Sequence, residues 1–163
     1  MDGLFHNPTV GDCEGSEVLN EIVSYVNQEP HQAYQITVGT DSTQLHGHAS
    51  FVSVVAVRRM GRGGRYFWQQ FENDLYSNLR QRIYAEASHS LDLASDLSQH
   101  LEGRLQSLPD SFDFDVEIHV DIGENGPTHE MITEIVGMIR GHGYEVRTKP
   151  EAYCAAVVAD KYA

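Results

Sequence analysis

Four carboxylates stand where this chain could do chemistry. Asp41 and Asp121 each end a β-like run, while Glu86 and Asp160 lie on apolar stripes of helical period. A lone buried carboxylate is costly, so such groups are normally paired with cations, hydrogen-bonded or bound to a metal. The chain has 24 acidic residues and only 11 Lys and Arg, which makes a divalent cation the simplest partner. Hard oxygen ligands favour Mg²⁺ or Mn²⁺ over zinc.

The first of these acids closes the run Tyr34–Ser42. Side chains alternate along a strand, so Gly39 and Asp41 share one face and Val38 lies on the other. The missing side chain at Gly39 leaves room beside the acid for a metal, a phosphate or a closely packed helix. Taken alone, Asp41 followed by Ser42 is also a common way to end a strand in a turn. Its role therefore depends on the other three acids.

The first half of the chain must place Asp41 and Glu86. Residues 1–13 are polar and predict an irregular lead-in, followed by a helix from about Ser16 that ends before Pro30. A long helix is expected over about residues 77–102, with Glu86 on the edge of its apolar stripe. Between the two helices, β-like runs occupy residues 34–42, 48–60 and 65–71, and the turn Gly61-Arg-Gly-Gly64 predicts an antiparallel hairpin from the last two.

The second half must place Asp121 and Asp160. Residues 114–121 alternate as a strand that ends at Asp121, and a helix closed by two glycines and a short strand follow. The sequence Thr148-Lys-Pro-Glu151 has the form of a capping box and predicts that the last helix begins there. The expected buried stripe of that helix includes Tyr153 and Asp160.

Composition narrows the class of protein. The 163 residues, 40% of them hydrophobic, suffice for one domain with a substantial core. The chain has no apolar run long enough to span a membrane and no basic start of a signal peptide, so we expect a cytoplasmic protein. Cys13 and Cys154 have no metal-type spacing, which predicts free thiols. The net charge of −13 argues against tight binding of duplex nucleic acid through a broad basic surface.

Two further groups of residues have two interpretations each. Four arginines between Arg58 and Arg65 could hold a phosphate, but an ordinary hairpin tip with solvated arginines explains them equally well. Trp68 and Tyr66 could stack on a base, whereas aromatic side chains on strands usually pack in a core.

Three histidines lie near the acids in the sequence. His89 follows Glu86 by three residues, and His129 opens a helix near Asp121, so either could take part in proton transfer or product release. His119 shares the strand face of Asp121, where a hydrogen-bonded core histidine is the better interpretation.

The ordered elements and their acids resemble the ribonuclease H fold. More narrowly, the chain resembles the YkuK-type family of bacterial ribonuclease H-like proteins. The resemblance runs from about Tyr34 to the C-terminus and depends on the ordered set, because each motif alone is weak. The motifs are Gly39-Thr-Asp41-Ser42, Gly61-Arg-Gly-Gly64, His119-Val-Asp121-Ile-Gly123 and Ala159-Asp160-Lys161.

This resemblance implies an α/β fold, a mixed five-stranded sheet flanked by helices with an extra N-terminal helix. Residues 1–33 would form the lead-in and that helix, and residues 34–163 the ribonuclease H-like domain, as a single globular unit. The implied activity is phosphodiester hydrolysis with two Mg²⁺ or Mn²⁺ ions. Asp41 would bridge both ions, Glu86 and Asp121 would complete the shell of one, and Asp160 that of the other.

The implied partner is nucleic acid, either RNA, DNA or a hybrid of the two. The acidic chain lacks a strongly basic surface that would bind a duplex. Either the substrate is small or single-stranded, or a protein partner or a second copy of the chain supplies the binding surface. The alternative is a catalytically inactive module that binds nucleic acid or protein. Convergence of all four acids favours the nuclease, whereas a displaced Asp160 or a salt-bridged Glu86 favours the module.

Overall fold

A long mixed β-sheet forms the centre of the protein. The computed structural model describes residues 1–45, 48–73, 76–106, 114–125 and 128–163. Within them the sheet has the strand order β2-β1-β5-β4-β3-β6-β7. The strands are β1 Leu4–Asn7, β2 Gly11–Glu14, β3 Tyr34–Leu45, β4 His48–Arg59, β5 Gly64–Asn73, β6 Val116–His119 and β7 Glu145–Arg147.

The topology confirms the expected α/β class and mixed sheet. β3, β4 and β5 pair antiparallel, while β6 and β7 add in parallel to β3. The strand count is seven and not five, because the segment expected to be an irregular lead-in forms the hairpin β1–β2 against β5. Strands of four residues are too short to show a period in the sequence, which explains the wrong expectation for residues 1–13.

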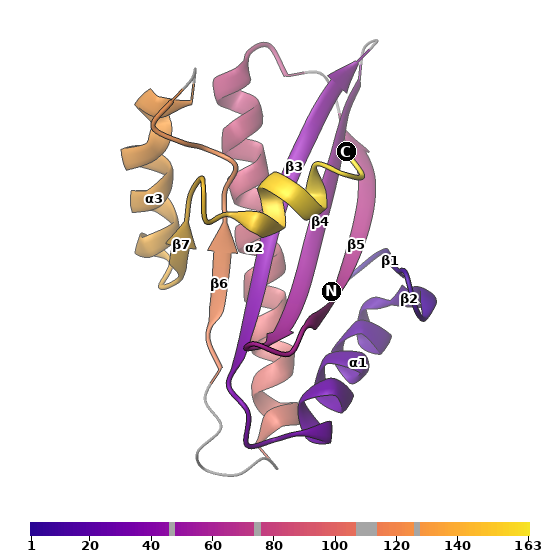
Figure 1. Cartoon of the computed structure of the whole chain (residues 1–163). Helices are drawn as coiled ribbons and strands as arrows, with labels where there is room; N and C mark the ends of the chain where they lie inside the picture. The colour runs from indigo at the N-terminus through magenta and orange to yellow at the C-terminus, as the bar shows by residue number, and fades with distance from the viewer. Residues whose placement is uncertain (46–47, 74–75, 107–113, 126–127) are drawn as a thin grey trace.

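Helices cover the two faces of the sheet unequally (Figure 1). The long helix α2 (Leu79–Leu105) runs behind β3 and contacts α1 (Gly15–Gln28), while α3 (Ile132–Gly141) lies beside β7. A short C-terminal helix, η2 (Cys154–Ala159), crosses the opposite face over β3 and β4. No helix in the described ranges is long and apolar enough to cross a membrane.

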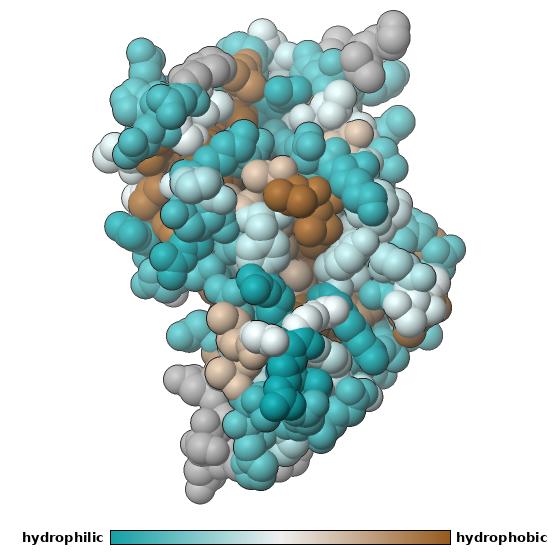
Figure 2. Space-filling model, viewed as in Figure 1, coloured by the Kyte–Doolittle hydropathy of each residue, from teal (hydrophilic) through white to brown (hydrophobic). Residues whose placement is uncertain are grey.

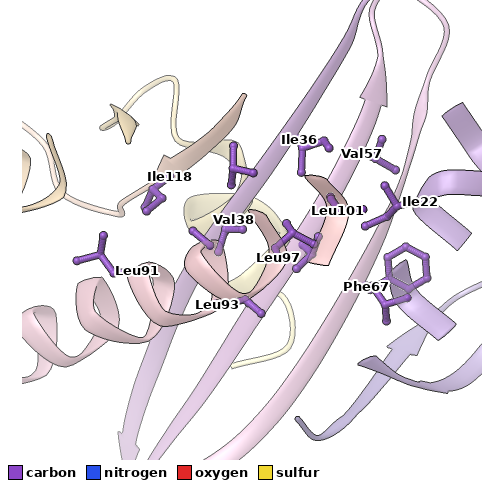
Figure 3. Packing of buried hydrophobic residues seen from close by; sticks show 14 of the residues in the cluster. Ile22, Ile36, Val38, Val57, Phe67, Leu91, Leu93, Leu97, Leu101 and Ile118 are labelled. Atoms are coloured by element: carbon purple, nitrogen blue, oxygen red, sulfur yellow. The ribbon is translucent and has the colours of Figure 1, made fainter. Parts of the chain in front are cut away.

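The main core lies between the sheet and the α1–α2 layer (Figure 3). Ile36 and Val38 of β3 point from the strand toward Leu97 and Leu101 of α2, as the alternation along β3 predicts. All four side chains are fully buried. The burial fixes α2 against β3 and so sets the distance between a helix and a strand that each carry one of the candidate acids.

The N-cap residue of helix α2 is Asn78. Asn78 precedes the first turn in an extended conformation, and its Oδ1 accepts a hydrogen bond of 2.9 Å from the backbone N–H of Gln81. The observed helix therefore agrees with the expected one to within a few residues. Glu86 is among the buried residues of this helix and accepts a hydrogen bond from Ser42 of β3.

The last helix differs from its prediction. It begins at Cys154 and not at Thr148, since residues 148–153 form turns in which Glu151 N–H donates to Thr148 O. Its winding is that of a π-helix, with Asp160 N–H donating to Ala155 O at 3.3 Å. The expected buried face was derived from a period of 3.6 residues per turn. A π-helix has more residues per turn, so different residues face the sheet.

Candidate active site at the ends of the central strands

Asp41 lies within β3, which continues to Leu45 and so does not end near Ser42 as expected, and Asp121 follows the end of the parallel neighbour β6 by two residues. Gly39 of β3 pairs with His119 of β6, and each acid stands two residues further along its chain. Parallel neighbours lie about 4.8 Å apart in a sheet, and alternation turns both acids toward the face crossed by η2. The pKa of Asp41 reflects this arrangement, because it is raised from 3.8 to about 6, first by burial and then by the charges of Asp121 and Asp160.

Glu86 comes from α2, on the face of β3 opposite to that of Asp41, since its hydrogen-bond partner Ser42 is the neighbour of Asp41 in β3. Its side chain is only 1% exposed, and Ser42 Oγ donates a 2.5 Å hydrogen bond to its Oε1. Its Oε2 is buried without a hydrogen-bond partner. Burial, helped by the charges of Asp41 and Asp121, raises the pKa of Glu86 from 4.5 to about 8, although Ser42 and Arg82 act to lower it.

Asp160 corrects the sequence interpretation. It was expected on a buried stripe of the last helix, yet its side chain is exposed. The buried residues of η2 are Cys154, Ala155 and Ala159, because the π-helix presents a different set to the sheet than a 3.6-residue period does. Asp160 still lies near the site, since its charge raises the pKa of Asp41.

Lys149 is the cation nearest to Asp121. Its Nζ lies 2.8 Å from Asp121 Oδ1, an ion pair whose direction leaves that oxygen without a well-directed hydrogen bond. The pKa of Lys149 is raised, first by this contact and then by the charges of Asp41 and Asp160. The ammonium therefore interacts with three of the four candidate acids.

Gly39 explains how η2 comes so close to the acids. A Cβ at this position would stand 2.8 Å from the backbone nitrogen of Ala155 and 3.1 Å from Cys154 Cβ. Of the three uses suggested for the missing side chain, a metal, a phosphate or a closely packed helix, the structure shows the helix. The glycine thus lets η2 lie directly on β3, which brings Asp160 toward Asp41.

A hollow opens on the side of the site that Lys149 faces. Its wall includes Gly123, His129, Thr148, Lys149 and Glu151. Figure 2 shows the face crossed by η2 as largely hydrophilic, with hydrophobic areas over η2, where Val157 is 63% exposed, and toward α3. The surroundings of the acids thus suit a polar ligand better than an apolar one.

Comparison with known proteins agrees with this geometry. The family model described as Ribonuclease H-like matches residues 17–163. The chain belongs to the ribonuclease H-like family. It is also similar to "Uncharacterized protein YkuK" of Bacillus subtilis (strain 168), with 27% identity over 171 residues that cover 98% of this chain and 96% of that protein. No solved structure matches.

The donor chemistry of this ribonuclease H-like chain fits a hard divalent cation. All four acids supply oxygen atoms, and Glu86 Oε2 is a buried carboxylate oxygen that lacks a donor. As the side chains stand, however, the described ranges contain no group of three or more His, Cys, Asp or Glu placed closely enough to hold one ion. The fit therefore depends on the chemistry of the donors and on the orphaned oxygen.

Two residues that contact the candidate acids were missed in the sequence. Ser42 was considered only as part of a turn and of a family motif, although as the neighbour of Asp41 it must face the opposite side of β3, where Glu86 lies. Lys149 was considered only as part of a capping box, and its contact with Asp121 spans two separate elements. Alternation could have found Ser42, whereas no local signal could have found Lys149.

The histidines have different environments. His119 is buried, its Nδ1 accepts from Cys154 N–H at 3.2 Å, and its Nε2 lies 2.8 Å from Glu117 Oε1, which agrees with the core interpretation. Burial lowers the pKa of His89, which packs edge-to-face on Phe51 and Phe71. These contacts give His119 and His89 structural roles.

Other side chains offered for ligand binding are engaged in packing or ion pairs. Trp68 stacks on Tyr162 with ring centroids 4.2 Å apart, and Tyr66 shares a hydrogen bond with the same tyrosine. Cys13 and Cys154 are free and buried, as expected. His129 differs from His89 and His119 in being exposed and lining the hollow beside Lys149.

The arginine cluster is mostly structural. Arg59 is 8% exposed and pairs with Glu29 at 2.7 Å, while Arg62 reaches the other oxygen of that carboxylate. Arg65 pairs with Glu21. These ion pairs bind the β4–β5 hairpin to α1, so neither solvated arginines nor a phosphate site describes the cluster as a whole. Arg58 alone of the four is exposed on the η2 face, over the ring of Tyr153.

Proposed function

We propose that this chain is a divalent-metal-dependent nuclease that hydrolyses phosphodiester bonds. One observation carries the proposal, the buried Glu86 Oε2 without a hydrogen-bond partner beside Asp41 and Asp121. A carboxylate in this setting is costly for folding unless it serves a purpose, and sites of this kind are enriched in functional groups. Membership of the ribonuclease H-like family supports the same reaction class.

Each acid has a role in the proposal. Asp41 would be shared between two Mg²⁺ or Mn²⁺ ions, with Glu86 and Asp121 on one ion and Asp160 on the other. When bound, such ions supply an activated water and stabilise the leaving oxygen of the phosphodiester. Ser42 holds Glu86 Oε1, so Oε2 is the oxygen of this carboxylate that has no hydrogen-bond partner and would be free to bind an ion.

The substrate is expected to be single-stranded or short nucleic acid. A net charge of −13 disfavours a long duplex, and the arginines that could have formed a basic surface are largely paired with Glu21 and Glu29. A protein partner or a second copy of the chain is the other way to supply affinity for RNA, DNA or a hybrid.

The test combines metal binding with cleavage. Wild type and Asp41→Asn are titrated with Mn²⁺ and Mg²⁺ by calorimetry, and both are assayed on single-stranded RNA, single-stranded DNA and an RNA–DNA hybrid. We expect wild type to bind and to cleave at least one substrate, and folded Asp41→Asn to do neither. Cleavage that persists in Asp41→Asn would overturn the assignment.

A second function is supported by a separate observation. Lys149 already neutralises Asp121, and Asp160 is exposed, as expected of a module that binds nucleic acid or protein without catalysis. Glu86 argues the other way, because no ion pair to it is found in the described ranges. Oligonucleotide binding that is unchanged by Asp41→Asn and by chelation of divalent ions would favour the module.

A further inference from the structure

Backbone contacts hold Lys149 close to the candidate acids. Its backbone N–H donates to Ile122 O at 2.8 Å, which fixes the segment after β7 beside the segment that carries Asp121. Its Cβ lies 3.1 Å from where a Cβ of Gly123 would stand. The absence of a side chain at Gly123 thus lets the stem of Lys149 lie close to the backbone, with its ammonium directed at Asp121.

The charge environment makes this ammonium distinctive. Among the described residues, Lys149 forms the one ion pair made by any of the four candidate acids. Arg82 also acts on Asp41 and Glu86, as a charge that lowers both pKa values and not as an ion-pair partner. Lys149 itself is 52% exposed and lines the hollow beside the site, so its flexible stem has room to move away.

We propose that Lys149 is a displaceable counter-ion of the carboxylate site, which competes with a divalent cation for Asp121 and so sets the affinity for that cation. This inference rests on the proposed function. In the absence of another cation, the ammonium offsets the repulsion among Asp41, Asp121 and Asp160. When a divalent ion binds Asp121, the ammonium is expected to move toward the hollow, whose wall includes Lys149.

Two opposite effects of removing Lys149 follow from this arrangement. Without divalent ions, Lys149→Met leaves the acids to repel one another and lowers the thermal midpoint, by a few degrees for a ΔΔG of about 1 kcal/mol. With Mn²⁺, the same substitution removes both a competitor for Asp121 and a like charge near the ion. We expect Mn²⁺ to bind at least about fivefold more tightly to Lys149→Met than to wild type.

The measurement is a Mn²⁺ titration by calorimetry at constant ionic strength, with thermal unfolding in the presence and absence of the ion. Lys149→Arg keeps the charge and is expected to remain within about twofold of wild type in Mn²⁺ affinity. Arg140→Gln is the matched control, because it removes one positive charge from an exposed position in the last turn of α3. It is expected to change neither quantity measurably.

Equal or weaker Mn²⁺ binding by Lys149→Met would overturn the proposal, as would an equal gain in Arg140→Gln, which would indicate a non-specific charge effect. Failure of the proposed function gives a different result, in which wild type and Asp41→Asn bind Mn²⁺ equally poorly. In that case the unfolding experiment without metal still tests the counter-ion role, since unchanged stability of Lys149→Met relative to Arg140→Gln contradicts it.

Discussion

Ser42 Oγ donates a 2.5 Å hydrogen bond to Glu86 Oε1 and thereby joins β3 to α2 at the carboxylate site. Both side chains are buried. Asp41 and Ser42 are adjacent and face opposite sides of β3, so one dipeptide supplies an acid to the η2 face and a hydroxyl to the α2 face. Glu86 depends on this hydroxyl, because it is the one hydrogen-bond donor to the carboxylate among the described residues.

Replacing Ser42 with alanine is expected to destabilise the protein by about 1–3 kcal/mol, because Glu86 Oε1 then joins Oε2 as a buried oxygen without a donor. The bond from Ser42 lowers the pKa of Glu86, so its loss should raise that pKa further and weaken Mn²⁺ binding at neutral pH. Urea unfolding and calorimetry measure the two effects. Ser50→Ala, which removes a partly buried hydroxyl that accepts from Gln70, is the control and should cost far less.

Glu86→Gln should change the pH dependence of stability in the absence of divalent ions. The pKa of Glu86 is raised from 4.5 to about 8 in the folded protein, so the carboxyl group favours folding at low pH and this contribution is lost as the pH rises through about 8. Glutamine cannot ionise. The variant should therefore match wild type near pH 5 and exceed it near pH 9, by at most roughly 3–5 kcal/mol.

Urea unfolding between pH 5 and pH 9 measures this difference. Glu102→Gln serves as the control, because it removes an exposed carboxylate from the same helix and should leave the pH dependence as in wild type. A wild-type stability that stays parallel to that of Glu86→Gln over the whole range would show that Glu86 does not carry a raised pKa in solution.

Gly39→Ala should displace the C-terminal helix. The added Cβ would stand 2.8 Å from Ala155 N, a backbone atom that cannot yield without moving η2. We expect a loss of about 1–3 kcal/mol in the free energy of unfolding and weaker Mn²⁺ binding, since η2 carries Asp160 to the site. Chemical denaturation and calorimetry report the two losses.

The matched control for this substitution is Gly137→Ala. Gly137 is an exposed position in α3 with no atom within 4 Å of an added Cβ, so alanine there should stabilise the helix by about 0.5–1 kcal/mol. If Gly39→Ala were as well tolerated as Gly137→Ala, the close approach of η2 to β3 would be wrong.

The sequence by itself determined the order of the main elements and two positions of the site. Periods of two and 3.6 residues are local properties, so they correctly predicted β3, α2 and the strand before Asp121. Alternation also placed Asp41 beside Gly39 on one face of β3. The register between β3 and β6 then brings Asp41 and Asp121 close to each other, although β3 continues to Leu45 and does not end at Asp41 as expected.

Only the tertiary structure decided which charges meet. The contact between Lys149 and Asp121 and the ion pairs of Arg59, Arg62 and Arg65 with α1 join residues from separate elements. Such pairs depend on the path of the whole chain and leave no period in the sequence. The exposure of Asp160 has the same origin. The packing of η2 on Gly39 and its π-helical winding set which residues of η2 face the sheet, and an ideal helical period does not describe them.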